Sequence, residues 1–342
     1  MKRNAAQKMA DLDRRYFLGE FDPWTDNSPE EGLTLDEAID RYIDSRRNSK
    51  RPATIRSDFS MLRTFCTTLS PGIVLNHIHN EHISSFMAEL RNKGKSSATQ
   101  TSYYTRLSHF FNWCVISSFI KSDPTTRIER PKLTKKEKRI LTKEQFNCLL
   151  REIKKDCEDR RGIVKSTDLV WLHDLLVVTV QTGLRVGEVC AMCWNWIDLE
   201  NQQIVVRRSA HFVPKRGHER TIPIRGEALA IVSRLSKRLG FINDADPVFP
   251  SSRGQKGDSH FLNPTYVSKR FLYYCRQVGL PKGISFHSLR HSFCTWMIAE
   301  NVPVPVVQRL AGHADITTTM GYVHVVNADL HSAVERVFSS SL

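Results

Sequence analysis

Apolar residues between positions 33 and 119 recur at the three- and four-residue spacing of an α-helix, and this periodicity constrains the fold more than any other feature. The first of four such segments opens at Thr34, and Glu37 three residues later completes a capping box. Gly94 ends the third segment. The sequence therefore predicts a small all-helical domain over residues 33–120.

A second domain is expected from Ile140 onward. Residues 168–182 have the pattern of a largely buried helix, and short β-rich runs separated by turn signals follow it. These runs are Trp196–Leu199, Ile204–Arg207 and Thr221–Ile224, after which helical patterns resume. The expected fold class is therefore mainly α with a small antiparallel β-sheet. The expected divisions are an N-terminal extension at 1–32, the helical domain at 33–120, a basic linker at 121–139 and a larger domain at 140–342.

The chain is strongly basic, and its charge is unevenly distributed. Fifty Lys and Arg residues stand against 36 Asp and Glu residues, for a net charge of +14, and most of the excess lies between residues 45 and 139. A concentrated basic excess indicates a polyanion such as DNA, although a solvated basic surface without a partner is the ordinary alternative. The residues expected to contact the DNA backbone are Arg46, Arg47, Lys50, Arg51, Arg56, Lys93, Lys95, Arg106, Lys135 and Lys136.

Several features argue against a membrane or exported protein. The sequence has no apolar run of about 18 residues that could cross a bilayer, and residues 1–13 lack the apolar core of a signal peptide. Eight cysteines are scattered along the chain, so reduced thiols are expected. Cys190 and Cys193 form a lone CxxC in a stretch that reads as helix, which favours buried thiols over a zinc or redox site. A cytoplasmic protein without a membrane partner is expected.

Two segments of the second domain contain arginines in positions suited to phosphate binding. The segment TGLRVGE places Arg185 at a predicted helix start, and Glu188 lies three residues later, where it can orient the guanidinium. The segment HSLRH places His287 and Arg290 on one face of a helix. Taken singly, each has an ordinary explanation, since surface arginines in capped helices and chance HxxR patterns are common.

A third segment, LAGHADITTT, contains His313 after an amphipathic helix, and Tyr322 follows nine residues past that histidine. Histidines also raise the question of a metal. A site built on His287 and His291 would need a third ligand, and no HExxH-like array supplies one, so no metal is expected.

Taken together and in this order, the three segments resemble the tyrosine recombinase (phage integrase) family. The shared blocks are TGLRxGE, HxLRH and LxGHxxxxTT with the following tyrosine, and the resemblance spans roughly residues 33–338. It implies a SAM-like core-binding domain followed by a tyrosine-recombinase catalytic domain. It also implies a catalytic lysine on a β-hairpin, where Lys215 is the candidate. The implied catalytic residues are Arg185, Lys215, His287, Arg290, His313 and the nucleophile Tyr322, with Glu188 and His324 beside them.

The chemistry of a DNA phosphodiester favours the same residue types. A tyrosine phenol can attack phosphorus and later be displaced by a sugar hydroxyl, so the covalent intermediate keeps the bond energy. Two guanidiniums can neutralise the non-bridging oxygens. A lysine can protonate the leaving 5′ oxygen, and a histidine can share the proton of the phenol. No metal or nucleotide cofactor is expected.

The resemblance implies a site-specific DNA recombinase that cleaves and rejoins duplex DNA through a 3′-phosphotyrosine link. It would serve integration and excision of a mobile element or Xer-like resolution. The expected partners are a specific duplex site, four copies of the chain on that DNA and an accessory directionality factor, with a monomer free in solution and a nucleoid-associated location. One alternative is a relaxing enzyme like type IB topoisomerases, which uses the same chemistry and would act as a monomer with little sequence choice. The other is a catalytically silent DNA-binding regulator, and the complete residue set argues against it.

The two ends of the chain carry further expectations from the resemblance. Residues 5–24 resemble only the last helix of the arm-binding domain that many mobile-element integrases carry. A helix over residues 327–338 is expected to dock either on its own domain or on a neighbouring protomer.

Overall fold

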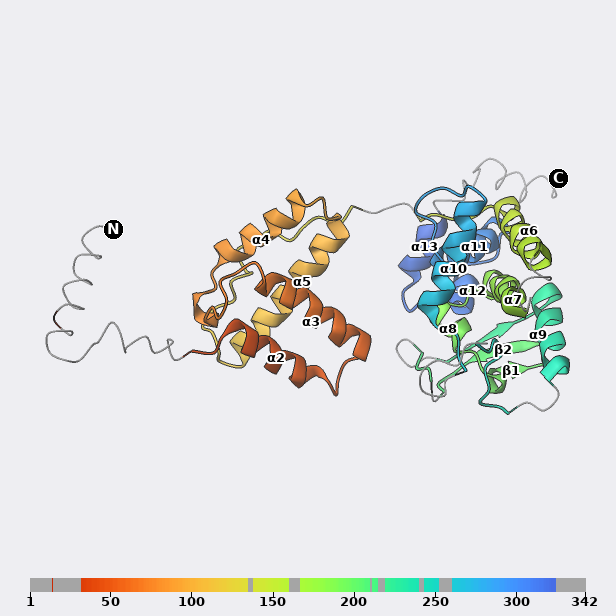
Figure 1. Cartoon of the computed structure of the whole chain (residues 1–342), viewed down its shortest axis with the longest axis horizontal. Helices are drawn as coiled ribbons and strands as arrows, with labels where there is room; N and C mark the ends of the chain where they lie inside the picture. The colour runs from red at the N-terminus through yellow and green to blue at the C-terminus, as the bar shows by residue number, and fades with distance from the viewer. Residues whose placement is uncertain are drawn as a thin grey trace, which may run out of the picture. The chain divides into compact units, whose positions relative to one another are not determined.

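The computed structural model describes residue 14 and residues 32–134, 138–159, 167–209, 211–214, 219–239, 243–251 and 260–323. The chain divides into two compact units, with the division between Lys136 and Glu137 (Figure 1). Within the described part of the chain, every helix is too short or too polar to cross a bilayer. The expectations that fall outside the described residues concern Lys135, Lys136, Lys215, His324, the N-terminal extension and the C-terminal helix.

The described residues of the first unit form helices joined by short connections. Thr34 opens the first helix, because its hydroxyl accepts from the backbone N–H of Glu37 at 3.3 Å while the Glu37 carboxylate accepts from the Thr34 N–H at 3.0 Å. The apolar faces meet in one core that contains Ile39, Phe65 and Phe110. The helical fold predicted from the periodicity is confirmed. The elements are α2 (Leu35–Arg46), α3 (Pro52–Cys66), the 3-10 turn η1 (Leu75–His77), α4 (Asn80–Asn92) and α5 (Ser97–Ile116).

Helix α7 (Thr167–Thr182) is the centre of the second unit (Figure 1). It packs against α6 (Lys143–Asp159), α9 (Gly226–Leu239) and α11 (His287–Ala299). Residues 175–178 of α7 are almost completely buried, which explains why the sequence there is apolar without a clear polar face.

A three-stranded antiparallel sheet lies in the same unit. The strands β1 (Ile197–Asp198), β2 (Gln203–Val206) and β3 (Arg220–Pro223) are hydrogen-bonded in that order. Ile204 pairs with Ile222 in the register, and both side chains are buried. The predicted fold class, mainly α with a small antiparallel sheet, is therefore confirmed, and the ends of each strand lie within one residue of the expected positions.

A left-handed glycine shapes the end of the second unit. Helix α12 (Val304–Ala311) ends at Gly312, which has φ +66° and terminates the helix as a C-cap. The chain then turns into α13 (Ile316–Val323), which packs against both α11 and α12. Tyr322, on α13, thereby comes to lie next to Lys138, near the start of the second unit. The remaining elements are α8 (Val186–Cys190), η3 (Trp194–Trp196) and α10 (Pro264–Gln277).

The CxxC pair has the expected burial but not the expected helix. Cys190 ends α8, and Cys193 lies beyond that helix, at the start of η3. Both thiols are free and almost fully buried. The helix prediction was too long here, because the backbone leaves α8 to lead into the sheet.

Candidate active site

Arg185 stands at the first turn of α8. Gly183 precedes it with φ +65°, and a side chain at that position would collide with the ring of Phe293. The backbone N–H of Arg185 donates to Oε2 of Glu188 at 2.8 Å, and its Nη1 donates to Oε1 of the same residue at 2.8 Å. Its Nη2 donates to the carbonyl of Gly312 at 3.1 Å. Glu188 thus holds the Arg185 side chain and backbone through these hydrogen bonds.

Arg290 approaches the same place from α11 and is only 1% exposed. Its Nη1 donates to the carbonyl of Gly183 at 2.7 Å, while Nε and Nη2 are buried and lack a hydrogen-bond partner among the described residues. Burial and the charge of Arg185 lower the pKa of Arg290 to about 10, so it stays cationic at neutral pH. A buried cation with unused donors is costly, and an anionic oxygen would satisfy it.

Tyr322 comes from α13 and is 1% exposed. Its hydroxyl oxygen lies 2.6 Å from Nδ1 of His291. The His313 ring lies nearly parallel to the Tyr322 ring, with centroids 6.1 Å apart. Nδ1 of His313 is 2.9 Å from the hydroxyl oxygen of Thr319. Burial raises the pKa of the Tyr322 phenol, so the hydroxyl is protonated in the free protein.

The three histidines near Tyr322 are neutral at physiological pH. Burial, followed by the charges of Arg290 and Arg185, lowers the pKa of His287 to about 4 and that of His313 to about 3. Burial, followed by the neighbouring His287 and Lys138, lowers the pKa of His291 to about 3. A neutral His291 with its proton on Nε2 accepts the hydrogen bond from the phenol through Nδ1.

Lys138, near the start of the second unit, lies over the ring of Tyr322. Its Nζ lies 3.5 Å from the centroid of the Tyr322 ring and donates to the carbonyl of Thr318 at 3.0 Å. Burial lowers the pKa of this amine. A cation over an aromatic face is attracted by the ring, and negative charge on the phenol oxygen strengthens that attraction.

These side chains line one cavity of about 340 Å³. Among the described residues, no group of three or more His, Cys, Asp or Glu side chains is arranged to hold a metal ion. Tyr322 lies beside the two arginines within a single copy of the chain, so the site can be assembled in cis. The cavity brings together Arg185, His287, Arg290, His313 and Tyr322 with Lys138 and His291; Lys215 lies outside the described residues.

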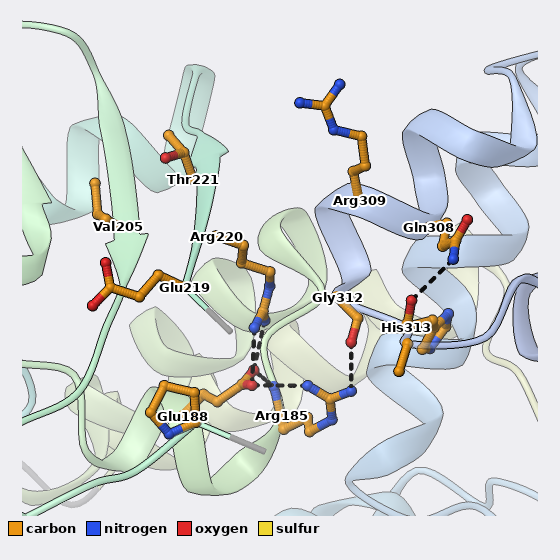
Figure 2. Close-up of a pocket in the computed structure, with 12 residues that line it drawn as sticks. Arg185, Glu188, Val205, Glu219, Arg220, Thr221, Gln308, Arg309, Gly312 and His313 are labelled. Atoms are coloured by element: carbon orange, nitrogen blue, oxygen red, sulfur yellow. Dashed lines mark hydrogen bonds and ion pairs between the residues drawn. The ribbon is translucent and has the colours of Figure 1, made fainter. Parts of the chain in front are cut away.

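A third arginine contacts Glu188 but is not among the described residues that line this cavity. Arg220, on β3, donates through Nη1 to Oε1 of Glu188 at 3.0 Å and through Nη2 to Oε2 at 2.7 Å. Figure 2 shows the Glu188 carboxylate between the guanidiniums of Arg185 and Arg220. Burial raises the pKa of Glu188, but the hydrogen bonds and charges of Arg220 and Arg185 outweigh this and hold that pKa at about 2.

The sequence alone indicated no catalytic role for Lys138, His291 or Arg220. His291 had a usable signal, since it lies four residues after His287 and therefore on the same helix face. Lys138 and Arg220 had none, because tertiary contacts alone place them beside Tyr322 and Glu188.

The basic residues expected to bind DNA in the first unit fall into two groups. Arg46 and Arg106 lie 3.5 and 3.0 Å from the carboxylate of Asp58, whose side chain is only 7% exposed, so both are engaged inside the helical unit. The other described ones are exposed, and two of them pair with an acid of the helix that they follow, Arg47 with Asp44 and Lys93 with Glu89. The exposed residues are Arg47, Lys50, Arg51, Arg56, Lys93 and Lys95.

Comparison with known proteins gives a consistent family assignment. The sequence profile of the phage integrase family matches residues 139–328. The tyrosine recombinase XerD of Shewanella oneidensis is 28% identical over 86% of this chain and 94% of its own length. The tyrosine recombinase XerA of Pyrococcus furiosus is 30% identical over 73% of this chain and 78% of its own. A lambda integrase tetramer bound to a Holliday junction has a similar fold, with a TM-score of 0.68 and 20% identity over 94% of this chain and 87% of that one.

Proposed function

Since this chain belongs to the phage integrase family of tyrosine recombinases and is a DNA-cleaving and rejoining, site-specific recombinase, we propose that Tyr322 is its nucleophile. The observation that supports this proposal is the shared cavity, which is lined by Tyr322 together with Arg185 and Arg290. The other residues assigned to catalysis are part of the same proposal.

In the first step the phenol oxygen of Tyr322 attacks the scissile phosphorus, and its proton passes to Nδ1 of His291. The P–O5′ bond breaks, and the 5′ oxygen leaves with the electron pair and takes a proton from a general acid, for which Lys215 is the candidate. Arg185 and Arg290 neutralise the non-bridging oxygens. The product is a 3′-phosphotyrosine and a free 5′ hydroxyl, and the reverse attack by a 5′ hydroxyl rejoins the strand.

The neutral histidines fit a site that is inactive without DNA. In the free protein the pKa of His291 is about 3 and the pKa of the Tyr322 phenol is raised, so proton transfer between them is unfavourable. A phosphate in the cavity adds negative charge near His291 and raises its pKa, which makes the transfer easier. Lys138 stabilises the charge that develops on the phenol oxygen.

The partners of the enzyme follow from the same proposal. We propose that the substrate is duplex DNA with a specific recombination site and that four copies assemble during strand exchange, as the lambda integrase tetramer on a Holliday junction supports. The exposed basic residues of the first unit would contact the DNA backbone. An accessory directionality factor and a cytoplasmic, nucleoid-associated location belong to this proposal. The recombinases and integrase reported above give no support to a topoisomerase-like enzyme or a silent regulator.

The test is covalent capture of DNA. The wild-type protein is incubated with genomic DNA of its source organism, denatured in detergent and purified, and the DNA that stays attached is sequenced. Tyr322→Phe is expected to bind DNA in a gel-shift assay but to capture none covalently. Tyr273→Phe, a change at an exposed tyrosine on α10, is the matched control and should capture DNA like the wild type. Capture by Tyr322→Phe would show that another residue is the nucleophile.

A further inference from the structure

Glu188 is shared by two arginines of different origin. Arg185 lies at the start of α8 and Arg220 lies on β3, and each donates to both oxygens of the carboxylate through side-chain or backbone N–H groups (Figure 2). The Glu188 side chain is 2% exposed, that of Arg220 is 10% exposed and that of Arg185 is 27% exposed. The most accessible member of the cluster is therefore the arginine that faces the active-site cavity.

The charge of this cluster depends on Arg220. Two guanidiniums and one carboxylate leave a net positive charge, whereas Arg185 and Glu188 alone would be neutral. A buried carboxylate that contacted Arg185 alone would cancel the charge of that guanidinium. It would also repel a nearby phosphate, because two negative charges repel strongly over a short distance in a medium of low dielectric constant. Arg220 donates to both oxygens of Glu188 and offsets its negative charge. The positive charge of Arg185 is therefore not fully cancelled by Glu188 and can attract an anion.

Arg220 also holds the backbone beside the catalytic histidine. Its Nε donates to the carbonyl of Leu310 at 3.1 Å, while Arg185 donates to the carbonyl of Gly312 at 3.1 Å. A Cβ atom at Gly312 would lie 2.8 Å from Cδ of Arg220, so the glycine is needed for this approach. The two arginines thus fix the end of α12 directly before His313.

The cavities separate the roles of the two arginines. Arg185 lines the cavity that contains Tyr322, and it also lines a neighbouring cavity of about 720 Å³. Among the described residues, Arg220 lines the neighbouring cavity and not the one with Tyr322. Arg220 is therefore connected to the cavity with Tyr322 through Glu188 and Arg185.

We propose that Arg220 is a positioning residue of the recombination reaction, which balances the charge of Glu188 so that Arg185 can stabilise the scissile phosphate in the transition state. This inference rests on the proposed function. It predicts an effect on the rate of strand cleavage and little effect on DNA affinity, because Arg220 is not among the described residues that line the cavity with Tyr322.

The first experiment measures single substitutions on the full chain. The substrate is a duplex with the sequence captured by the wild-type protein, and the readout is the rate of covalent adduct formation at saturating DNA. Arg220→Ala should slow the reaction by about 10- to 100-fold, somewhat less than loss of a direct transition-state donor. Arg220→Lys should retain more activity because it keeps the charge. Arg225→Ala is the matched control and should react like the wild type, since in the described part of the chain Arg225 donates to the backbone carbonyls of Gln202 and Ile224.

The decisive variant is the double substitution Glu188→Gln with Arg220→Ala. Glutamine keeps an oxygen that can accept from Arg185 but removes the negative charge, so the double variant should react about 10-fold faster than Arg220→Ala alone. If Arg220 had a purely structural role, the double variant would react no faster than Arg220→Ala alone, because two members of the cluster would then be changed instead of one. Thermal melting identifies variants that fail to fold, and Arg220→Gln replaces Arg220→Ala in both comparisons if needed.

The outcomes separate this inference from the proposed function. If the wild type forms no adduct, the proposed function is wrong. If the wild type reacts and Arg220→Ala reacts equally fast, or if the double variant gains nothing over Arg220→Ala, the charge-balancing role of Arg220 is wrong and the nucleophile assignment stands. A large loss of DNA affinity in Arg220→Ala would instead mean that Arg220 contacts the phosphate directly, which also overturns the inference.

Discussion

Each of the two units contains a buried carboxylate shared by two arginines, and the two clusters differ in what lies beside them. In the helical unit, Asp58 on α3 joins Arg46 on α2 to Arg106 on α5. In the second unit, Glu188 on α8 joins Arg185 to Arg220 on β3. Both clusters connect elements that are separate in sequence.

Exposure alone does not tell the two clusters apart. The side chains of Arg46 and Arg106 are 20% and 27% exposed, and that of Arg185 is 27% exposed. The difference is the adjoining cavity, which is lined by Tyr322 and by Arg290, whose Nε and Nη2 are buried without a hydrogen-bond partner among the described residues. Two arginines on one carboxylate therefore do not by themselves indicate a phosphate site, and the proposal for the second unit depends on the further arginine and the tyrosine that line the same cavity.

The largest expected difference between the clusters is in strand cleavage. Arg185→Ala should slow covalent adduct formation by at least about 100-fold, because it removes a fixed donor to the transition state. Arg46→Ala should leave the rate at saturating DNA unchanged, because Arg46 is engaged with Asp58 in the other unit. Both rates are measured with the captured duplex. Near-normal cleavage by Arg185→Ala would contradict its assigned role.

A smaller effect is expected on stability in the helical unit. Asp58→Ala leaves Arg46 and Arg106 without their shared acid and should lower the local stability of α2, α3 and α5 by about 2 kcal/mol, a value reduced for the partial exposure of the arginines. Hydrogen–deuterium exchange of the full chain measures this, and the amides of α7 serve as the internal control. Unchanged protection in these helices would mean that the cluster contributes nothing to their packing.

The smallest effect is expected for exposed lysines of the helical unit. Replacing Lys93 and Lys95 together by glutamine should weaken binding to all DNA sequences by a similar factor, and should reduce the slope of log affinity against log salt by about 2 if both contact phosphates. Lys143→Gln, a change at an exposed lysine paired with Glu300, is the control. An unchanged slope in the double variant would remove these two lysines from the proposed DNA contact.

The sequence predicted the helices and strands well because their signals are local. The capping box at Thr34 and the apolar periodicity of the first unit act over a few residues, and so does the glycine that ends α12. The motifs around Arg185, His287 and Tyr322 could be matched to a family because each block is short and contiguous. The ion pairs that join Asp58 to Arg46 and Arg106 could not be predicted, since the acid is distant in sequence from both arginines.

By itself, the sequence determined the fold class and the family and predicted the catalytic residues, because periodicity and contiguous motifs are carried by neighbouring positions. Only the tertiary structure decided that His291 is the hydrogen-bond partner of Tyr322, that Lys138 lies over its ring and that Arg220 shares Glu188. Hydrogen bonds and charge interactions act over a few ångströms in space, and the folding of the second unit alone brings these groups within that range.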